Sequence, residues 1–250
     1  MKTNYFIKQS KVPESMDLYI YDYVTGDEVN VFGEVTESST SANYIKSQLE
    51  NAIDVKTINI YINSYGGSVS EGLAIYNQLK RHPAHKIVHI DGFACSIASV
   101  IAMARDKVIM GSNTLMMIHH AAMGVFGNAK DLKKAAADIE IIDGASCSSY
   151  LAKAGNKLTQ AKLTQLLDNE TWLDATQCIY YGLADSIEGE EDSTNTIDQA
   201  KQRYKQSIQA EINRTQKDIK VPKELTKQKT NAEKLMEAYK NRKTNGEKLN

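Results

Sequence analysis

Apolar positions in the first three quarters of the chain follow two alternating spacings. Short β-rich runs lie at 18–24, 58–62, 86–90, 107–110 and 115–118. Between and after them, residues 41–53, 69–81, 96–105, 128–154, 159–167 and 175–181 repeat apolar side chains at helical spacing. Strands that alternate with helices in this way predict an α/β fold with a largely parallel sheet covered by helices.

Composition changes near residue 189. Residues 190–250 contain no Trp, Phe or Cys and carry 14 Lys or Arg against 10 Asp or Glu. Such a segment cannot bury enough apolar surface to offset the entropy of ordering it, and Pro222 interrupts a helix there. We therefore expect one folded domain at 1–189 and a charged tail at 190–250, disordered or helical. The tail is either a solvated linker or a segment that binds a scaffold protein.

Composition also limits the class of protein. The chain shows no signal peptide and no run of about 18 apolar residues, the length that a membrane span needs, so we expect a soluble cytoplasmic protein. With a net charge of -1, the chain as a whole has neither the excess of basic residues typical of a nucleic-acid-binding surface nor the excess of acidic residues typical of an acidic tether. Cys95, Cys147 and Cys178 lack CxxC spacing and predict small buried residues, with neither a disulfide framework nor a zinc site.

Two loops follow predicted strands, where an open α/β sheet places its ligand site. The first is Asn-Ser-Tyr-Gly-Gly-Ser at 63–68. Its paired glycines, Gly66 and Gly67, allow backbone conformations that aim N–H groups at a bound oxygen. Nucleotide binding is disfavoured because the loop lacks the spacing and the lysine of a phosphate-binding loop.

The second loop, at 91–99, carries Ser96 between small residues at the start of a predicted helix. A tight strand-to-helix turn of this kind exposes a serine hydroxyl, and the free N–H groups of the helix start favour a developing oxyanion. Taken alone, an isolated serine at this position is better explained as a helix N-cap. The rest of the sequence favours a nucleophile.

A serine nucleophile needs a base and an acid. His119 and His120 both end the strand 115–118 and either can take the serine proton, whereas His82, His85 and His89 are expected to face solvent. The acid that holds the histidine tautomer lies at 168–174. Spacing alone does not choose among its three carboxylates, Asp168, Glu170 and Asp174.

Four motifs resemble the Clp protease family, and more specifically its phage branch of head maturation proteases. They are Ile-Asn-Ser-Tyr-Gly-Gly-Ser-Val at 62–69, Gly-Phe-Ala-Cys-Ser-Ile-Ala-Ser at 92–99, Met-Ile-His at 117–119, and Glu-Thr-Trp-Leu-Asp-Ala at 170–175 leading into Tyr-Gly-Leu-Ala-Asp at 181–185. The similar stretch runs from about 19 to 187. The resemblance implies a crotonase-like ββα spiral, with the helix at 128–154 as the handle by which rings stack.

The same resemblance implies roles for single residues. Ser96 would be the nucleophile, His119 rather than His120 the base, and Glu170 the acid, where housekeeping members have aspartate. The oxyanion hole would be the N–H groups of Gly67 and Ile97. An extended substrate would pair with the strand at 65–67, that is with Tyr65, Gly66 and Gly67. Tyr65 replaces the proline of housekeeping members and Ala98 replaces their glycine. Neither a metal nor a cofactor is implied.

The N-terminal residues do not resemble the axial loop that engages an unfolding ATPase, and the tail is longer than that of housekeeping members. We therefore expect an ATP-independent serine endopeptidase that cleaves capsid and scaffold precursors during phage head maturation. It would act as a homo-oligomeric ring, in the host cytoplasm and the prohead, without an ATPase, nucleic acid or membrane. The alternatives are a housekeeping, ATP-dependent Clp proteolytic subunit and a catalytically silent crotonase-like assembly protein.

Overall fold

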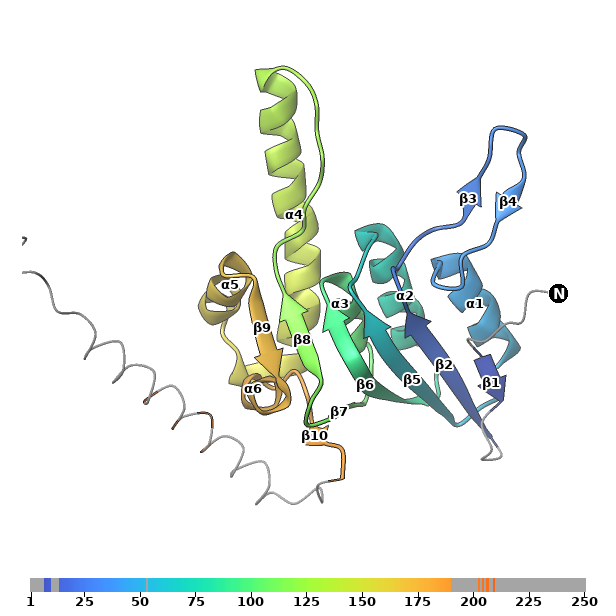
Figure 1. The fold of residues 1–250 in the computed structure, drawn as a ribbon, viewed down its shortest axis with the longest axis vertical. Helices are drawn as coiled ribbons and strands as arrows, with labels where there is room; N and C mark the ends of the chain where they lie inside the picture. The colour runs from blue at the N-terminus through green and yellow to red at the C-terminus, as the bar shows by residue number, and fades with distance from the viewer. Residues whose placement is uncertain are drawn as a thin grey trace, which may run out of the picture. The chain divides into compact units, whose positions relative to one another are not determined.

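The structure is a computed structural model that describes residues 7–9, 14–52 and 54–189, together with Gln202, Tyr204, Gln206 and Gln209 (Figure 1). The chain divides into two units, Met1–Tyr204 and Lys205–Asn250. The first unit extends past the compositional boundary at 189, because Tyr204 is buried and its hydroxyl lies 2.9 Å from that of Tyr181. Apart from the four single residues, the predicted tail at 190–250 lies outside the described residues.

One sheet organises the first unit. Its order is β1-β2-β5-β6-β7-β10, with β8 pairing both β6 and β9. The strands are β1 (Ile7–Gln9), β2 (Ser15–Tyr21), β5 (Thr57–Ser64), β6 (His85–Cys95), β7 (Lys107–Met110), β8 (Leu115–Ile118), β9 (Thr171–Asp174) and β10 (Ser186–Ile187). All the pairs are parallel except β1 with β2 and β8 with β9. The predicted α/β class and parallel sheet are confirmed.

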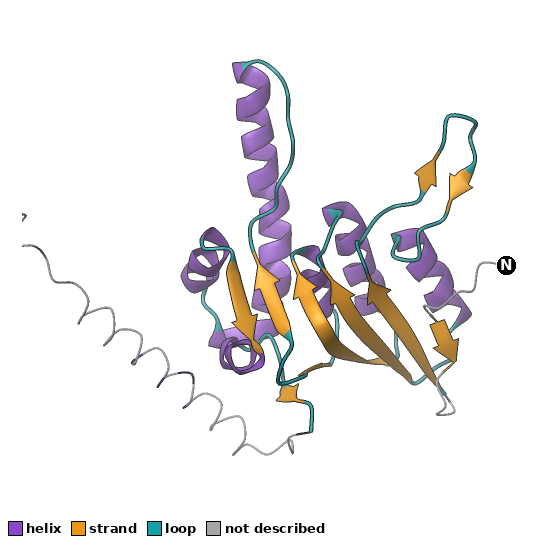
Figure 2. Cartoon of the chain, in the orientation of Figure 1, coloured by secondary structure: helices purple, strands orange, loops and turns teal. Residues whose placement is uncertain are grey.

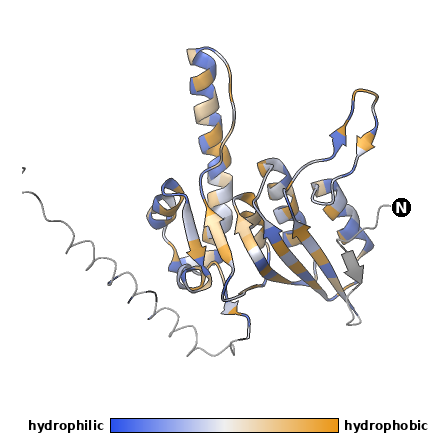
Figure 3. Ribbon diagram, viewed as in Figure 1, coloured by the Kyte–Doolittle hydropathy of each residue, from blue (hydrophilic) through white to orange (hydrophobic). Residues whose placement is uncertain are grey.

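Helices cover the apolar face of this sheet, and Figure 2 shows α1, α2 and α3 behind its central strands. The helices are α1 (Ala42–Asn51), α2 (Val69–Arg81), α3 (Ile97–Ala102), α4 (Ala129–Ala154), α5 (Gln160–Asp168) and α6 (Ala175–Tyr181), with a 3-10 turn at Gly155–Lys157. Alternate residues of β2, β5 and β6 are buried, and Figure 3 shows the matching alternation of hydropathy along these strands. The core therefore lies between the sheet and the helices.

Strand β6 changes neighbours half-way along its length. Its first half pairs with β7 up to Ile90 and its second half, from Phe93, pairs with β8. Glycine at 92 fits this change, since a Cβ there would lie 2.5 Å from Oδ1 of Asn63. The split brings the end of β6 beside the end of β8, so residues 96 and 119 follow neighbouring strands.

Sequence periodicity located most of these elements. The bounds predicted for α2, α6, β7 and β8 are those of the structure, whereas β6 runs five residues further, to Cys95. Hydrophobic periodicity did not predict the hairpin of β3 (Glu28–Val29) and β4 (Val35–Thr36), whose Val31 and Phe32 are exposed. Exposed apolar residues do not follow the alternation that marks a half-buried strand. None of the described helices is long and apolar enough to cross a membrane.

Candidate active site

Ser96 occupies the turn between β6 and α3. Its backbone angles are φ 53° and ψ -129°, a conformation that residues with a Cβ rarely adopt. The turn is held by the Ser96 N–H, which donates to the carbonyl of Met117 at 2.8 Å. The Ser96 side chain makes no capping hydrogen bond to α3. Ser96 therefore occupies the N-cap position of α3 without capping it, and the hydroxyl is available for chemistry.

The thiol of the neighbouring residue, Cys95, is unreactive. Cys95 is fully buried, and this burial raises its pKa to about 11. Only a thiolate is a good nucleophile, so Cys95 stays protonated and unreactive near neutral pH. All three cysteines are free and buried, as predicted. Of the two neighbouring candidate nucleophiles, only the partly exposed Ser96 can reach a ligand.

Gly66 and Gly67 lie against this turn in conformations that require glycine. Their φ angles are +96° and +145°. A Cβ on Gly66 would lie 2.7 Å from the Cβ of Ser96, and one on Gly67 would lie 2.2 Å from the carbonyl oxygen of Val24. The glycine pair therefore lets one backbone segment approach both the serine turn and the end of β2.

Val24 fixes the direction in which Gly67 points. The Val24 N–H donates to Gly66 O at 2.7 Å, and the Ser68 N–H donates to Val24 O at 2.8 Å. In a parallel bridge of this type the N–H and carbonyl of the residue between, Gly67, point to the opposite side. Neither the Gly67 nor the Ile97 N–H donates to any described group. Both donors are thus free to bind an oxyanion.

His119 follows β8 and shares a small cavity with Ser96. The cavity has a volume of only about 10 Å³ and is also lined by Val69, Ile97, Val100, Ala121, Asp143, Ser146 and Tyr150. No hydrogen bond or ion pair joins the His119 ring to another of the residues described. A serine and an unengaged imidazole in one cavity are the two groups that nucleophilic catalysis requires.

His120 is engaged elsewhere. Its Nδ1 is hydrogen-bonded to Oδ2 of Asp143, and its Nε2 lies 3.0 Å from Oδ1 of Asp168. Burial alone would lower the pKa of His120, but the hydrogen bonds to the two carboxylates outweigh it and raise the pKa. With both ring nitrogens occupied, His120 cannot accept a proton from serine. Of the two histidines left open by spacing, the geometry favours His119.

The three candidate acids have different partners. Asp174 caps α6 by accepting from the Gln177 N–H at 2.7 Å, and Asp168 binds His120. Glu170 is exposed, has φ 44°, and makes no side-chain hydrogen bond to any described residue. Its register is informative: Ile118 pairs with Thr171 in the antiparallel β8–β9 ladder, so one further step of the same register places Glu170 opposite His119. The structure does not join the two side chains.

Asp143 was absent from the sequence analysis. It lies on α4, inside a long helix of mixed polarity, and nothing in the local pattern separates it from other helical carboxylates. The contact between α4 and the end of β8 is what brings it to the cavity. The prediction that His82 faces solvent is wrong, since only 9% of this residue is exposed, whereas His85 is exposed.

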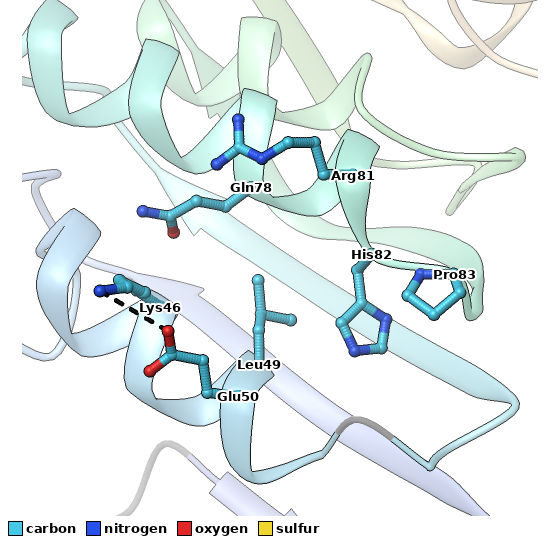
Figure 4. Close-up of a pocket in the computed structure, with 7 residues that line it drawn as sticks. All are labelled: Lys46, Leu49, Glu50, Gln78, Arg81, His82 and Pro83. Carbon is cyan, nitrogen blue, oxygen red and sulfur yellow. Dashed lines mark ion pairs between the residues drawn. The ribbon is translucent and has the colours of Figure 1, made fainter.

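His82 instead lines a second, larger pocket of about 290 Å³ between α1 and α2 (Figure 4). Its Nδ1 accepts from the Ala84 N–H at 3.2 Å, and burial lowers its pKa. On the other side of the pocket Lys46 and Glu50 form an ion pair at 3.5 Å. The lining contains neither serine nor cysteine, so this pocket lacks a hydroxyl or thiol nucleophile, and the cavity at Ser96 is the candidate active site.

Comparison with known proteins gives a consistent result. Residues 18–191 match the family described as Clp protease. The chain is 30% identical over 158 residues to "ATP-dependent Clp protease proteolytic subunit 3" of Rhodococcus jostii, covering 62% of this chain and 77% of the relative. It is 31% identical over 152 residues (59% and 68%) to the ATP-dependent Clp protease proteolytic subunit of Porphyromonas gingivalis, and 30% identical over 173 residues (67% and 83%) to that of Deinococcus radiodurans.

The match runs from within β2 to beyond β10 and includes every loop that contributes to the cavity at Ser96. The chain belongs to the Clp protease family of serine peptidases.

Proposed function

We propose that this chain is the proteolytic subunit of an ATP-dependent peptidase, with Ser96 as nucleophile, His119 as general base and Glu170 as the acid. The observation that carries the catalytic assignment is the strained Ser96 turn, where a hydroxyl that caps no helix lines one cavity together with Ile97 and the unengaged His119 imidazole. This arrangement is suited to acyl transfer.

Substrate would bind as an extended strand. The N–H and carbonyl of Gly67 face away from Val24, so a peptide can pair with this backbone as an added strand. Tyr65 beside the pair is 58% exposed and packs edge-on to Phe93, with ring centroids 5.6 Å apart. Residues 65–67 would therefore place the scissile carbonyl next to Ser96.

The reaction follows from these positions. Ser96 Oγ attacks the carbonyl carbon while its proton passes to His119, and the Gly67 and Ile97 N–H groups bind the negative oxygen of the tetrahedral intermediate. When this collapses, the C–N bond breaks, the amine takes the proton from His119, and an ester to Ser96 remains. Water, deprotonated by His119, then hydrolyses the ester and restores the serine.

The acid is supported by elimination and by register. Asp174 and Asp168 already have partners, whereas Glu170 is free and lies one step beyond the last β8–β9 pair. A carboxylate in this place would hold the His119 tautomer and stabilise its charged form. Glutamate is one methylene longer than aspartate. Its carboxylate can therefore extend further from the turn before β9 toward His119.

The proposed function includes an unfolding ATPase as the partner of this subunit. The relatives named above are ATP-dependent subunits, and their names favour an ATPase-coupled peptidase over the capsid-processing enzyme that the N-terminus and tail suggested. The two differ in a measurable way. Degradation of a folded protein that requires ATP and an unfolding ATPase supports the first, and ATP-independent cleavage of capsid or scaffold precursors supports the second.

The catalytic assignment is tested with a fluorescent fluorophosphonate, which labels activated serines. We expect wild-type labelling, none in Ser96→Ala, and labelling at least about 100-fold slower in His119→Ala, because the general base is lost. Ser148→Ala and His85→Ala, both at exposed positions, are the matched controls and should label normally. Full labelling of Ser96→Ala would place the nucleophile elsewhere.

A further inference from the structure

Helix α4 is hydrogen-bonded to the segment that follows β8 and contains His119. The Asp143 carboxylate uses both oxygens there: Oδ1 accepts from the Ala121 N–H at 2.8 Å and Oδ2 is hydrogen-bonded to His120 Nδ1. Its side chain is only 16% exposed. From the other side Asp168 of α5 reaches His120 Nε2 at 3.0 Å. The residues directly after His119 are therefore clamped between two helices.

The same helix is bonded to the serine turn. The Ser99 hydroxyl donates to the carbonyl of Ser96 at 2.5 Å and lies 2.6 Å from the Tyr150 hydroxyl. Since the single hydroxyl hydrogen of Ser99 goes to that carbonyl, Tyr150 is the donor in the second bond. Tyr150 is 2% exposed, and burial raises its pKa, so it keeps the proton that this bond needs.

These two anchors lie on one face of α4. Asp143 and Tyr150 are seven positions apart, two helical turns, and both line the cavity that contains Ser96 and His119. The intervening cavity residue, Ser146, is on the same face. One helix thus forms hydrogen bonds to both catalytic segments, through the Asp143 carboxylate and through the Tyr150 hydroxyl. The Tyr150 ring packs in the core, which leaves its hydroxyl as the group that reaches the serine turn.

We propose that Asp143 and Tyr150 are positioning residues: Asp143, acting through His120, sets the place of His119, and Tyr150, acting through Ser99, sets the place of Ser96. The inference rests on the proposed function, because it needs Ser96 and His119 as the reacting pair. Ser96 lies in a strained turn and His119 directly follows the end of β8, so a small displacement of either segment changes the serine–histidine distance. A misplacement of about 1 Å lowers rates by about 100-fold.

The test measures the rate constant of fluorophosphonate labelling in full-length Asp143→Asn and Tyr150→Phe proteins, with melting temperatures measured alongside. We expect labelling about 10- to 100-fold slower for each, at temperatures where both variants are folded. Asp138→Asn, elsewhere on α4, and Tyr44→Phe, a buried tyrosine in α1, are the matched controls and should label at the wild-type rate.

Double variants identify the route. If Asp143 acts through His120, Asp143→Asn combined with His120→Gln labels no more slowly than the slower single variant, and the same holds for Tyr150→Phe with Ser99→Ala. A general loss of stability would instead make the effects add. The charged groups facing His120 are Asp143 on α4 and Asp168 on α5. The Asp143 contribution should therefore shrink at alkaline pH, where His120 loses its proton.

The outcomes separate the two proposals. Wild-type labelling in both Asp143→Asn and Tyr150→Phe, with none in Ser96→Ala, overturns the positioning role and leaves the proposed function intact. Labelling that persists in Ser96→Ala overturns the proposed function itself. If Asp143→Asn does not fold, Asp168→Asn tests the same clamp from its exposed side, since the Asp168 side chain is 62% exposed. Unchanged labelling there counts against the clamp.

Discussion

Three residues at the active site share backbone conformations that most amino acids avoid. Ser96, Gly66 and Gly67 all have positive φ angles, and Gly66 lies against the Ser96 side chain. Such conformations cost about 1–3 kcal/mol each for residues with a Cβ and persist only where the surroundings impose them. Here the surroundings are Val24, which follows β2 and is hydrogen-bonded to Gly66 and Ser68, and Met117 of β8, whose carbonyl accepts from the Ser96 N–H.

Gly66→Ala should abolish fluorophosphonate labelling and lower the unfolding free energy by about 1–3 kcal/mol, because the new methyl group would overlap Ser96 Cβ and Cys95 O in a strained conformation. Labelling and urea denaturation measure the two effects. Gly144→Ala is the matched control: no atom lies within 4 Å of its added Cβ, it is helical, and it should raise stability slightly. Normal labelling of Gly66→Ala would contradict the role of the close approach.

The His120 clamp makes stability depend on pH. The pKa of His120 in the folded chain is raised above its ordinary value of 6.5, so the folded state binds the proton more tightly than the unfolded state. The contribution is complete below about pH 6.5 and is lost as pH rises through the raised pKa. We expect His120→Gln to lower the unfolding free energy by about 1 kcal/mol at pH 6, and by less at pH 9.

Urea denaturation at both pH values measures this difference. His85→Gln provides the control, since His85 also faces a carboxylate, Asp106 at 3.4 Å, but at an exposed site. An effect of His120→Gln that grows with pH would contradict the assigned charge state.

At the scale of elements, the short segment from α5 to α6 distributes its carboxylates among different tasks. Asp174 closes a capping box with Gln177 at the start of α6, and Asp168 ends α5. Glu170 lies between them in the turn before β9 and has no structural partner among the described residues. Structural and catalytic roles are therefore separable by substitution.

Asp174→Ala should remove a helix cap and lower the unfolding free energy by about 1 kcal/mol while leaving labelling unchanged. Glu170→Gln should do the reverse, slowing peptide cleavage by about 100-fold or more with little change in melting temperature, because it removes the charge that stabilises protonated His119. Melting curves and cleavage assays on both variants check the pair. Slow cleavage in Asp174→Ala alone would reassign the acid.

At the scale of the whole molecule, several large apolar side chains are exposed to solvent on α4 and on the segment before it. Phe126 is fully exposed and Ile141 is 75% exposed, and Met123, Val125 and Leu132 are each more than 40% exposed. Apolar patches of this kind mark contact surfaces. They agree with the handle role that family resemblance implies for this helix.

We expect the wild-type chain to form a multi-subunit ring, and Phe126→Asp with Ile141→Asp to reduce its mass, because the charges would be desolvated in the contact between subunits. Sedimentation velocity measures the mass, and circular dichroism checks that the fold is retained. Lys133→Glu, an exposed charge reversal on α4, is the control. An unchanged sedimentation coefficient in the double variant would remove α4 from the assembly surface.

Periodicity and motifs identified α2, α6, β7 and β8 and drew attention to Ser96, His119 and the glycine pair. These features are readable because helical and strand periods are local and because the serine turn requires small residues around it. Motif order along the chain was enough to indicate the family, which the comparisons established.

The amino-acid sequence by itself thus determined the α/β class, the principal elements and the chemical types at the site. Only the tertiary structure decided that His120 lies between Asp143 and Asp168, that Tyr150 reaches the Ser96 turn through Ser99, and that His82 is buried. These contacts join residues 23 to 51 positions apart. Side chains that far apart meet only after helices have packed on the sheet, and helix packing depends on long-range shape complementarity that local patterns do not contain.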